Sequence, residues 1–268
     1  MTADADDPPV TTPDFATWKA QGRKISVLTA YDYTMARLLD ASGVDCLLVG
    51  DTLGMVVQGR PTTLGVTLDQ MVYHAEMVAR GASRALVVAD LPFGSYQVSP
   101  EQAIASASRF LKETQSQAVK LEGGRRMAPT IRALVDADIP VMGHVGLTPQ
   151  SIRRLGGFKV QRDEDRIRDD ALAVADAGAF AIVLECVPSD VAARVTAELP
   201  IATIGIGAGA ACDGQVLVTP DLLGLFEGFR PKFVRRYAEL GEPIRRAARE
   251  YVADVQAGRF PSPGESFR

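Results

Sequence analysis

The chain has 268 residues, of which 47% are hydrophobic and 23% are charged, and these proportions are typical of a globular protein with a sizeable core. Its formal net charge of −4 argues against a general nucleic-acid binder, and no uninterrupted apolar stretch approaches the length of a membrane span. The three cysteines are few and unclustered, so we expect reduced thiols in the cytoplasm and no structural zinc site.

The N-terminal segment, residues 1–12, has acidic residues and prolines where a secretory signal would have a basic start and an apolar core. We expect it to be a flexible leader. Residues 13–268 contain no low-complexity tract and no Gly/Ser-rich linker. The sequence therefore predicts one domain over this range, which includes a C-terminal helical segment.

Short apolar runs recur along the chain, with helical segments between them. Runs such as LLVG at 47–50 and LVVA at 86–89 are apolar at every position, as is typical of parallel strands buried on both faces. The alternation predicts an α/β fold, a (β/α)8 TIM barrel with a short N-terminal extension and extra C-terminal helices. The eight strands are expected at 25–30, 45–50, 85–90, 117–122, 140–145, 181–185, 201–206 and 215–219.

The spacing of the last two strands departs from a regular barrel. Only about nine residues separate them, whereas a helical crossover between parallel strands needs a dozen or more. Either the helix between them is trimmed or the eighth strand is misplaced. A doubly wound open sheet is the alternative architecture.

Two of the predicted helices begin with capping signals. Thr67 followed by Gln70, and Ser99 followed by Gln102, match the capping box, in which each side chain bonds to the other residue's backbone N–H. Pro100 takes the first helical position, where an N–H would have no partner. The helix after Thr67 is expected to continue to about residue 80. Residues 231–257, beyond the eighth strand, are also expected to be helical.

Four strands end on an acidic residue, namely Asp51, Asp90, Glu122 and Glu185. An aspartate after a strand can simply cap the next helix, but glutamate is a poor N-cap and Asp90 lies too far ahead of the helix at Pro100. The carboxyl ends of parallel strands meet at one mouth of a barrel, where barrel enzymes hold their active sites. The pattern therefore predicts an enzyme whose clustered carboxylates favour a bound Mg²⁺.

Lys120 lies two residues before Glu122, so both side chains point to the same side of their strand. The lysine could form a Schiff base with a carbonyl substrate, or stay charged and bind a substrate carboxylate. His144, at the end of the fifth strand, is either a substrate contact or a structural residue. The glycine run Gly205–Gly209 after the seventh strand either binds phosphate or forms a tight strand exit.

Nine motifs follow one another along the chain: TAYDY, LLVGDTLGM, ADLPFGSY, VKLEGG, GHVGLTPQS, GGFKVQ, LECVP, IGIGAG and DGQVLV. From about residue 13 onward the sequence resembles the ketopantoate hydroxymethyltransferase family. The resemblance implies transfer of a hydroxymethyl group from 5,10-methylenetetrahydrofolate to 3-methyl-2-oxobutanoate, which gives ketopantoate and tetrahydrofolate in pantothenate biosynthesis. It also implies one Mg²⁺ per subunit and a homodecamer of two pentameric rings. The net charge and the lack of a long apolar stretch lead us to expect no nucleic-acid or membrane partner.

The resemblance also assigns roles by position. It implies that Asp51 and Asp90 bind magnesium, that Glu122 belongs to the same metal site directly or through water, and that Glu185 is the catalytic base. Thr52 stands where serine is more common in the family, and it keeps the hydroxyl while adding a methyl group. The expected substrate contacts are Asp51, Thr52, Asp90 and Lys120, to which His144 is added from its place in the fifth strand.

Under this assignment Lys120 pairs with substrate oxygens, and the Schiff base becomes the second interpretation. The alternative function is that of a magnesium-dependent carbon–carbon lyase or phosphoenolpyruvate mutase type barrel. Such an enzyme shares the enolate and Mg²⁺ chemistry but needs no folate.

Overall fold

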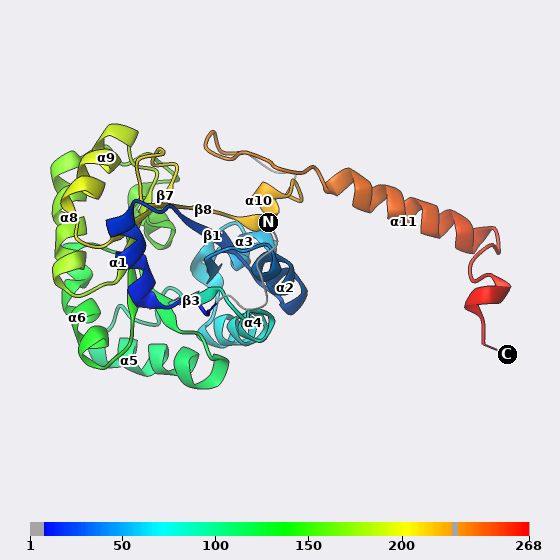
Figure 1. Cartoon of the computed structure of the whole chain (residues 1–268), viewed down its shortest axis with the longest axis horizontal. Coiled ribbons are helices and arrows are strands. Elements are labelled where there is room, and N and C mark those ends of the chain that lie inside the picture. The colour runs from blue at the N-terminus through cyan, green and yellow to red at the C-terminus, as the bar shows by residue number, and fades with distance from the viewer. Residues whose placement is uncertain (1–7, 227–229, 268) are drawn as a thin grey trace. The chain divides into compact units, whose positions relative to one another are not determined.

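In the computed structural model, which describes residues 8–226 and 230–267, eight parallel strands close into a barrel in the order β1 to β8 (Figure 1). All eight predicted strands are confirmed, and the closed order excludes the open sheet. The strands are β1 (Ile25–Thr29), β2 (Cys46–Val49), β3 (Leu86–Asp90), β4 (Ala118–Lys120), β5 (Val141–Gly146), β6 (Ala181–Glu185), β7 (Ala202–Ile206) and β8 (Gly214–Leu217).

Helices surround the strands, as Figure 1 shows for α4, α5, α6, α8 and α9. The helices of this unit are α1 (Thr12–Gln21), α2 (Tyr33–Ala41), α3 (Leu53–Val56), α4 (Leu68–Gly81), α5 (Pro100–Arg109), α6 (Ala128–Asp136), α7 (Ile152–Leu155), α8 (Glu164–Asp176) and α9 (Ser189–Glu198). Shorter turns are η1 (Thr63–Gly65), η2 (Phe110–Thr114), η3 (Arg125–Met127) and η4 (Pro149–Ser151). No helix among the described residues is long and apolar enough to cross a membrane.

The strands are apolar on both faces because each face packs into a different core. In β3, Leu86 and Val88 belong to the cluster inside the barrel, whereas Val87 and Ala89 belong to the cluster between the strands and the helices. Phe15 of α1 joins the inner cluster, where its ring meets Phe180 edge-on with centroids 5.3 Å apart. The continuous apolar runs therefore follow from burial on both sides.

The chain divides into two compact units, residues 1–217 and 218–268. The first contains the barrel, and the second contains α10 (Thr219–Leu222), α11 (Gly241–Gln256) and η5 (Pro263–Glu265). The single domain over 13–268 stays a prediction, as does the flexible leader, of which residues 1–7 lie outside the described residues. In the described part of that leader Val10 is buried, and its N–H donates to the carbonyl of Arg84 at 2.8 Å.

The short connection between β7 and β8 contains no helix, so the crossover is trimmed and the eighth strand is where the sequence predicts it. Gly207 and Gly209 have φ of 63° and 84°, in the left-handed region that favours glycine. The Gly205–Gly209 run therefore forms a tight strand exit.

Two helical predictions need correction. The capping box of α4 is complete, but at α5 only Ser99 caps, because the Gln102 amide accepts from the N–H of Val98 and donates to the carbonyl of Gly94. Of residues 231–257 only α11 is helical, and 231–240 are irregular. There the N–H groups of Tyr237 and Leu240 donate to the carbonyls of residues 222 and 223, and not to the fourth residue before them.

At the N-terminal ends of the strands, side-chain oxygens replace missing strand partners. This happens at three pairs of neighbouring strands. In each pair, a side-chain oxygen of the residue just before the later strand accepts a hydrogen bond from the backbone N–H of the second residue of the earlier strand. The pairs are Asp45 with Ser26 at 2.9 Å, Gln117 with Val87 at 2.8 Å and Asp213 with Thr203 at 2.9 Å.

Asp40, in the last turn of α2, holds the turn that leads into β3. Its buried carboxylate accepts from the N–H and hydroxyl of Ser83 at 2.9 and 2.7 Å, from the N–H of Arg84 at 3.1 Å and from the N–H of Ala85 at 2.7 Å. Burial raises the pKa of Asp40, but these hydrogen bonds outweigh burial and hold it below its ordinary value.

We predict that Asp40→Ala lowers the free energy of unfolding by about 2–4 kcal/mol at pH 7, because several buried donors lose their acceptor. Asp40→Asn should lose less. Since folding lowers this pKa, the stabilisation is complete above the unfolded value of about 3.9 and is lost as pH falls through the folded pKa. Urea titrations between pH 7 and pH 2 would measure this. The exposed Asp136→Asn is the control, and equal stability of the Asp40 and Asp136 variants at pH 7 would contradict the prediction.

Candidate active site

The acidic strand ends meet at one mouth of the barrel, as the sequence predicts. Asp90 pairs in register with Lys120, and Gly146 at the end of β5 pairs with Glu185. The backbone N–H of Asp51 donates to Asp90 Oδ2 at 3.0 Å, which joins the ends of β2 and β3. The predicted residues of β2 to β5 here are buried apart from the half-buried Thr52, and the Glu185 side chain is 17% exposed. These side chains therefore form a recessed site, in which Glu185 is the carboxylate most exposed to solvent.

A continuous series of polar contacts crosses this mouth. Lys120 Nζ lies 3.1 Å from Asp90 Oδ1 and 3.3 Å from His144 Nδ1. On the other side of the imidazole, His144 Nε2 lies 3.2 Å from Glu185 Oε2, which is within ion-pair distance although the contact lacks good hydrogen-bond geometry. His144 thus connects the lysine to Glu185.

The protonation of this series follows from the donors it contains. Burial lowers the pKa of His144 and the Lys120 charge lowers it further, against the opposing effect of Glu185. Burial opposes the charge on Lys120, yet Asp90, Glu122 and Asp51 together raise its pKa. A charged lysine can only donate, so Nδ1 of a neutral His144 accepts a hydrogen bond from the Lys120 ammonium. The imidazole N–H is then at Nε2, which faces Glu185.

Gln150, which the sequence analysis did not single out, fixes the position of Asp51. Its Nε2 donates to Asp51 Oδ2 at 2.9 Å and to the carbonyl of Leu91 at 3.0 Å. Its Oε1 accepts from the Tyr96 hydroxyl at 2.7 Å, and its backbone N–H donates to Glu122 Oε2 at 3.0 Å. Tyr96 and Gln150 lie within two of the quoted motifs, but no sequence spacing relates them to Asp51.

The cluster has more negative charge than its own lysine neutralises. Burial and the charge of Asp90 raise the pKa of Asp51 to about 7, although Lys120 and the Gln150 amide oppose the rise. Burial and the charge of Asp51 raise the pKa of Glu122 well above its ordinary value. A further cation at this mouth would be stabilised by the carboxylates.

The donor set fits a magnesium ion. Asp51 and Asp90 supply hard carboxylate oxygens, and Mg²⁺ is usually held by one or two carboxylates together with water and substrate. Within the described residues, Asp90 Oδ1 accepts no hydrogen bond of good geometry, although Lys120 is near. No group of three or more His, Cys, Asp or Glu in the described ranges is already arranged as a metal cage. Glu122 Oε2 instead accepts a hydrogen bond from the backbone N–H of Gln150, which favours contact of Glu122 with a metal through a water molecule.

Thr52 and Tyr31 form the edge of the mouth at β1 and β2. Their hydroxyl oxygens lie 2.8 Å apart, so Thr52 keeps a hydrogen-bonding role despite its extra methyl group. Burial raises the pKa of Tyr31, which therefore stays neutral. On the opposite side, Cys186 follows Glu185 with φ of 49°, an uncommon conformation for a residue with a side chain.

Known proteins match this chain over almost its whole length. The family described as ketopantoate hydroxymethyltransferase matches residues 9–263. The 3-methyl-2-oxobutanoate hydroxymethyltransferase of Heliobacterium modesticaldum is 56% identical over 262 residues, covering 96% of this chain and 95% of that protein. The protein of the same name from Trichlorobacter lovleyi is 56% identical over 261 residues, which cover 96% of this chain and 98% of that protein.

Solved structures of lower identity share the fold. A phosphonopyruvate hydrolase in complex with oxalate and Mg²⁺ has a TM-score of 0.62 at 12% identity, covering 96% of this chain and 93% of that one. A phosphoenolpyruvate phosphomutase from Streptomyces platensis has a TM-score of 0.62 at 16% identity, and the match covers 92% of this chain and 88% of that one. At such identities the likeness concerns the barrel alone.

Proposed function

The chain belongs to the ketopantoate hydroxymethyltransferase family, and on that premise we propose roles for the residues at its barrel mouth. Its reaction is the transfer of a hydroxymethyl group to 3-methyl-2-oxobutanoate, which forms ketopantoate in pantothenate biosynthesis. We propose 5,10-methylenetetrahydrofolate as the donor of the one-carbon unit. The three free thiols, Cys46, Cys186 and Cys212, support the cytoplasm as its location.

Asp51 and Asp90 would hold one Mg²⁺ directly, and Glu122 would belong to the same site through a water molecule. The raised pKa values of Asp51 and Glu122 support this assignment, because they reflect negative charge that a cation would neutralise. A bound divalent cation supplies Lewis-acid chemistry that favours loss of a proton next to a keto group.

Lys120 anchors the carboxylate of the keto acid as a charged ammonium, with Asp51, Thr52 and Asp90 around the substrate. Its pKa is raised by three surrounding carboxylates, so the lysine stays protonated at neutral pH. A Schiff base requires a neutral amine, and the electrostatics of the mouth therefore favour the anchor over the Schiff base. His144 contacts the same ammonium, so we assign it to positioning Lys120 and Glu185.

Glu185 removes the C3 proton of the keto acid. It is the one carboxylate of the mouth that is only half-buried, and the N–H of His144 faces one of its oxygens and leaves the other for the substrate. Water releases the one-carbon unit: its oxygen bonds to the methylene carbon of the folate, the two C–N bonds of that carbon break, and each nitrogen takes a proton, which gives tetrahydrofolate and a carbon at the oxidation level of formaldehyde. The electron pair left at C3 then forms the carbon–carbon bond to that carbon, and its oxygen takes up the proton held by Glu185, which gives ketopantoate.

Assembly into a decamer of two pentameric rings is a further part of the proposal. One feature of the chain supports self-association: none of the residues of α11 is buried, and its exposed apolar side chains share one helix face. These residues are Ile244, Tyr251, Val252 and Val255. A monomer in sedimentation of the intact chain at micromolar concentration would contradict this assembly.

A magnesium-dependent lyase or mutase is the alternative that the sequence left open; a phosphomutase and a lyase share the barrel at 16% identity, and that likeness concerns the fold alone. Keto acid and Mg²⁺ incubated with and without methylenetetrahydrofolate separate the two functions. Product that forms only with folate supports the transferase, whereas turnover without folate supports the alternative.

We predict that Glu185→Gln lowers the rate of C3 proton exchange of 3-methyl-2-oxobutanoate by about 100-fold to 10,000-fold, because the amide cannot accept the proton. Exchange into deuterated water, followed by NMR, measures this step without folate. Undiminished exchange in the variant would show that another group is the base.

Removal of a metal ligand should have a different signature. Calorimetric titration of Mg²⁺ in the presence of the keto acid is expected to show affinity reduced about 100-fold or more for Asp51→Asn and for Asp90→Asn, since even outer-shell substitutions commonly reduce it 10-fold to 100-fold. Glu185→Gln serves as the matched carboxylate control and should bind Mg²⁺ nearly as the parent does. Equal losses in all three variants would refute the division between metal ligands and base.

A further inference from the structure

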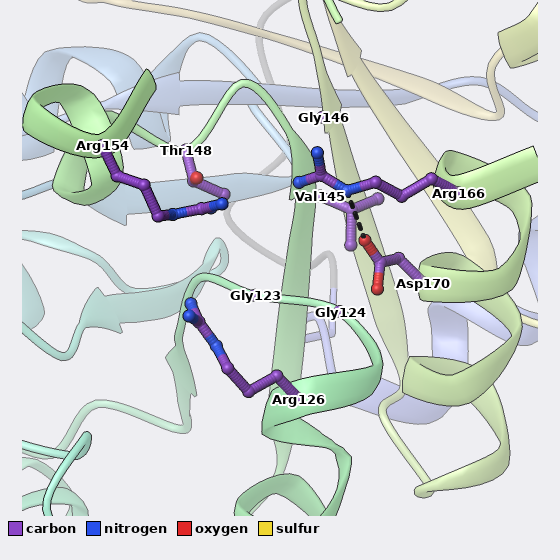
Figure 2. Close-up of a pocket in the computed structure, with 9 residues that line it drawn as sticks. All are labelled: Gly123, Gly124, Arg126, Val145, Gly146, Thr148, Arg154, Arg166 and Asp170. Carbon is purple, nitrogen blue, oxygen red and sulfur yellow. Dashed lines mark ion pairs between the residues drawn. The ribbon is translucent and has the colours of Figure 1, made fainter. Parts of the chain in front are cut away.

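Beside the carboxylate cluster lies a second recess with a volume of about 350 Å³. Three arginines reach it from three elements: Arg126 from η3, Arg154 from α7 and Arg166 from α8. Figure 2 shows the guanidinium groups of Arg126 and Arg154 directed into the same space from different sides, while Arg166 extends past Val145. The recess is therefore lined by cationic groups on separate parts of the backbone.

The charge of this recess is not neutralised by its own residues. Asp170 is its one acidic lining residue, and that carboxylate is already engaged, accepting the N–H of Arg125 at 2.8 Å and lying 3.6 Å from Arg166 Nε. In the part of the chain that the structure describes, Arg126 and Arg154 have no carboxylate within ion-pair distance. The recess thus presents two unpaired guanidinium groups, which is a site for an anion.

Two glycines line the recess at positions where there is no room for a side chain. A Cβ at Gly124 would lie 2.0 Å from the Asp170 carboxyl carbon, and one at Gly146 would lie 2.3 Å from the carbonyl oxygen of Glu185. A side chain at Gly124 would displace Asp170, and one at Gly146 would displace the backbone of Glu185, the proposed base. The buried Thr148 completes the lining with a hydroxyl group.

The recess adjoins the reacting groups through the backbone. Gly123 directly follows Glu122 and donates its N–H to the carbonyl of His144 at 2.9 Å. Gly146 pairs with Glu185, so the lining of the recess is continuous with strands β4, β5 and β6 of the catalytic mouth. A ligand that occupies both places must be longer than the keto acid, and the folate is the longer of the two proposed reactants.

We propose that this arginine-lined recess binds the carboxylates of the glutamyl tail of the folate co-substrate. A glutamyl group carries two carboxylates, and guanidinium groups pair with carboxylates in a bidentate geometry. Arg126 and Arg154 are the principal partners, with Arg166 held by Asp170 at the rim. The inference rests on the proposed function, because it places the second substrate of the same reaction.

The test uses Arg126→Gln and Arg154→Gln in the full chain, with Arg125→Gln and Arg153→Gln as neighbouring controls that do not line the recess. Each recess variant is expected to raise KM for methylenetetrahydrofolate about tenfold, because one charge-assisted interaction is lost. KM for the keto acid and the folate-independent C3 proton exchange should not change. Arg154→Lys keeps the charge and should recover part of the affinity.

A second substrate identifies the group that is bound. With methylenetetrahydropteroate, in which a single benzoate carboxylate replaces the glutamyl dicarboxylate, the parent and the recess variants should have similar KM values. If the recess variants keep the parent KM for methylenetetrahydrofolate, or raise KM equally for both folates, the proposal is wrong. Failure of the proposed function would look different, since the parent chain itself would then show no folate-dependent turnover.

Discussion

The Lys120 ammonium, buried among three carboxylates, is the interaction on which the catalytic mouth depends. A cluster containing Asp51, Asp90 and Glu122 could not stay ionised in a buried place without cations, since each charge loses hydration and repels the others. Lys120 supplies one positive charge from the adjacent β4, and the register of β3 with β4 sets its distance from Asp90. The negative charge that remains is the physical reason why we propose a divalent metal at the same place.

The lysine also determines how the proton chemistry is organised. Because its ammonium donates a hydrogen bond to Nδ1 of His144, the imidazole carries its own proton on Nε2. This nitrogen faces Glu185, at the half-buried side of the mouth. One buried charge thereby separates two kinds of carboxylate. Asp51, Asp90 and Glu122 share the lysine's field and suit a cation, whereas Glu185 contacts it only through the histidine and suits a base.

The two ends of the barrel have different tasks. At the N-terminal ends, side chains such as Asp45 and Asp213 complete the hydrogen bonding of neighbouring strands, and at the C-terminal ends the carboxylates form the proposed active site. This separation explains how barrels of 12–16% identity retain one architecture. The backbone framework needs only paired strands and two apolar layers, while the reaction depends on which side chains occupy the strand ends.

The sequence by itself determined the eight strands, the residues at their ends and the family. Strands buried on both faces are apolar throughout, and barrel closure brings their carboxyl ends to one mouth whatever the helices do. Tertiary structure alone decided the contacts between distant residues: Gln150 with Asp51, 99 positions apart, and the irregular path of 231–240 against the carbonyls of 222 and 223. Only folding also brought Arg126, Arg154 and Arg166 around one recess. Such contacts depend on loop paths, which local propensity and periodicity do not encode.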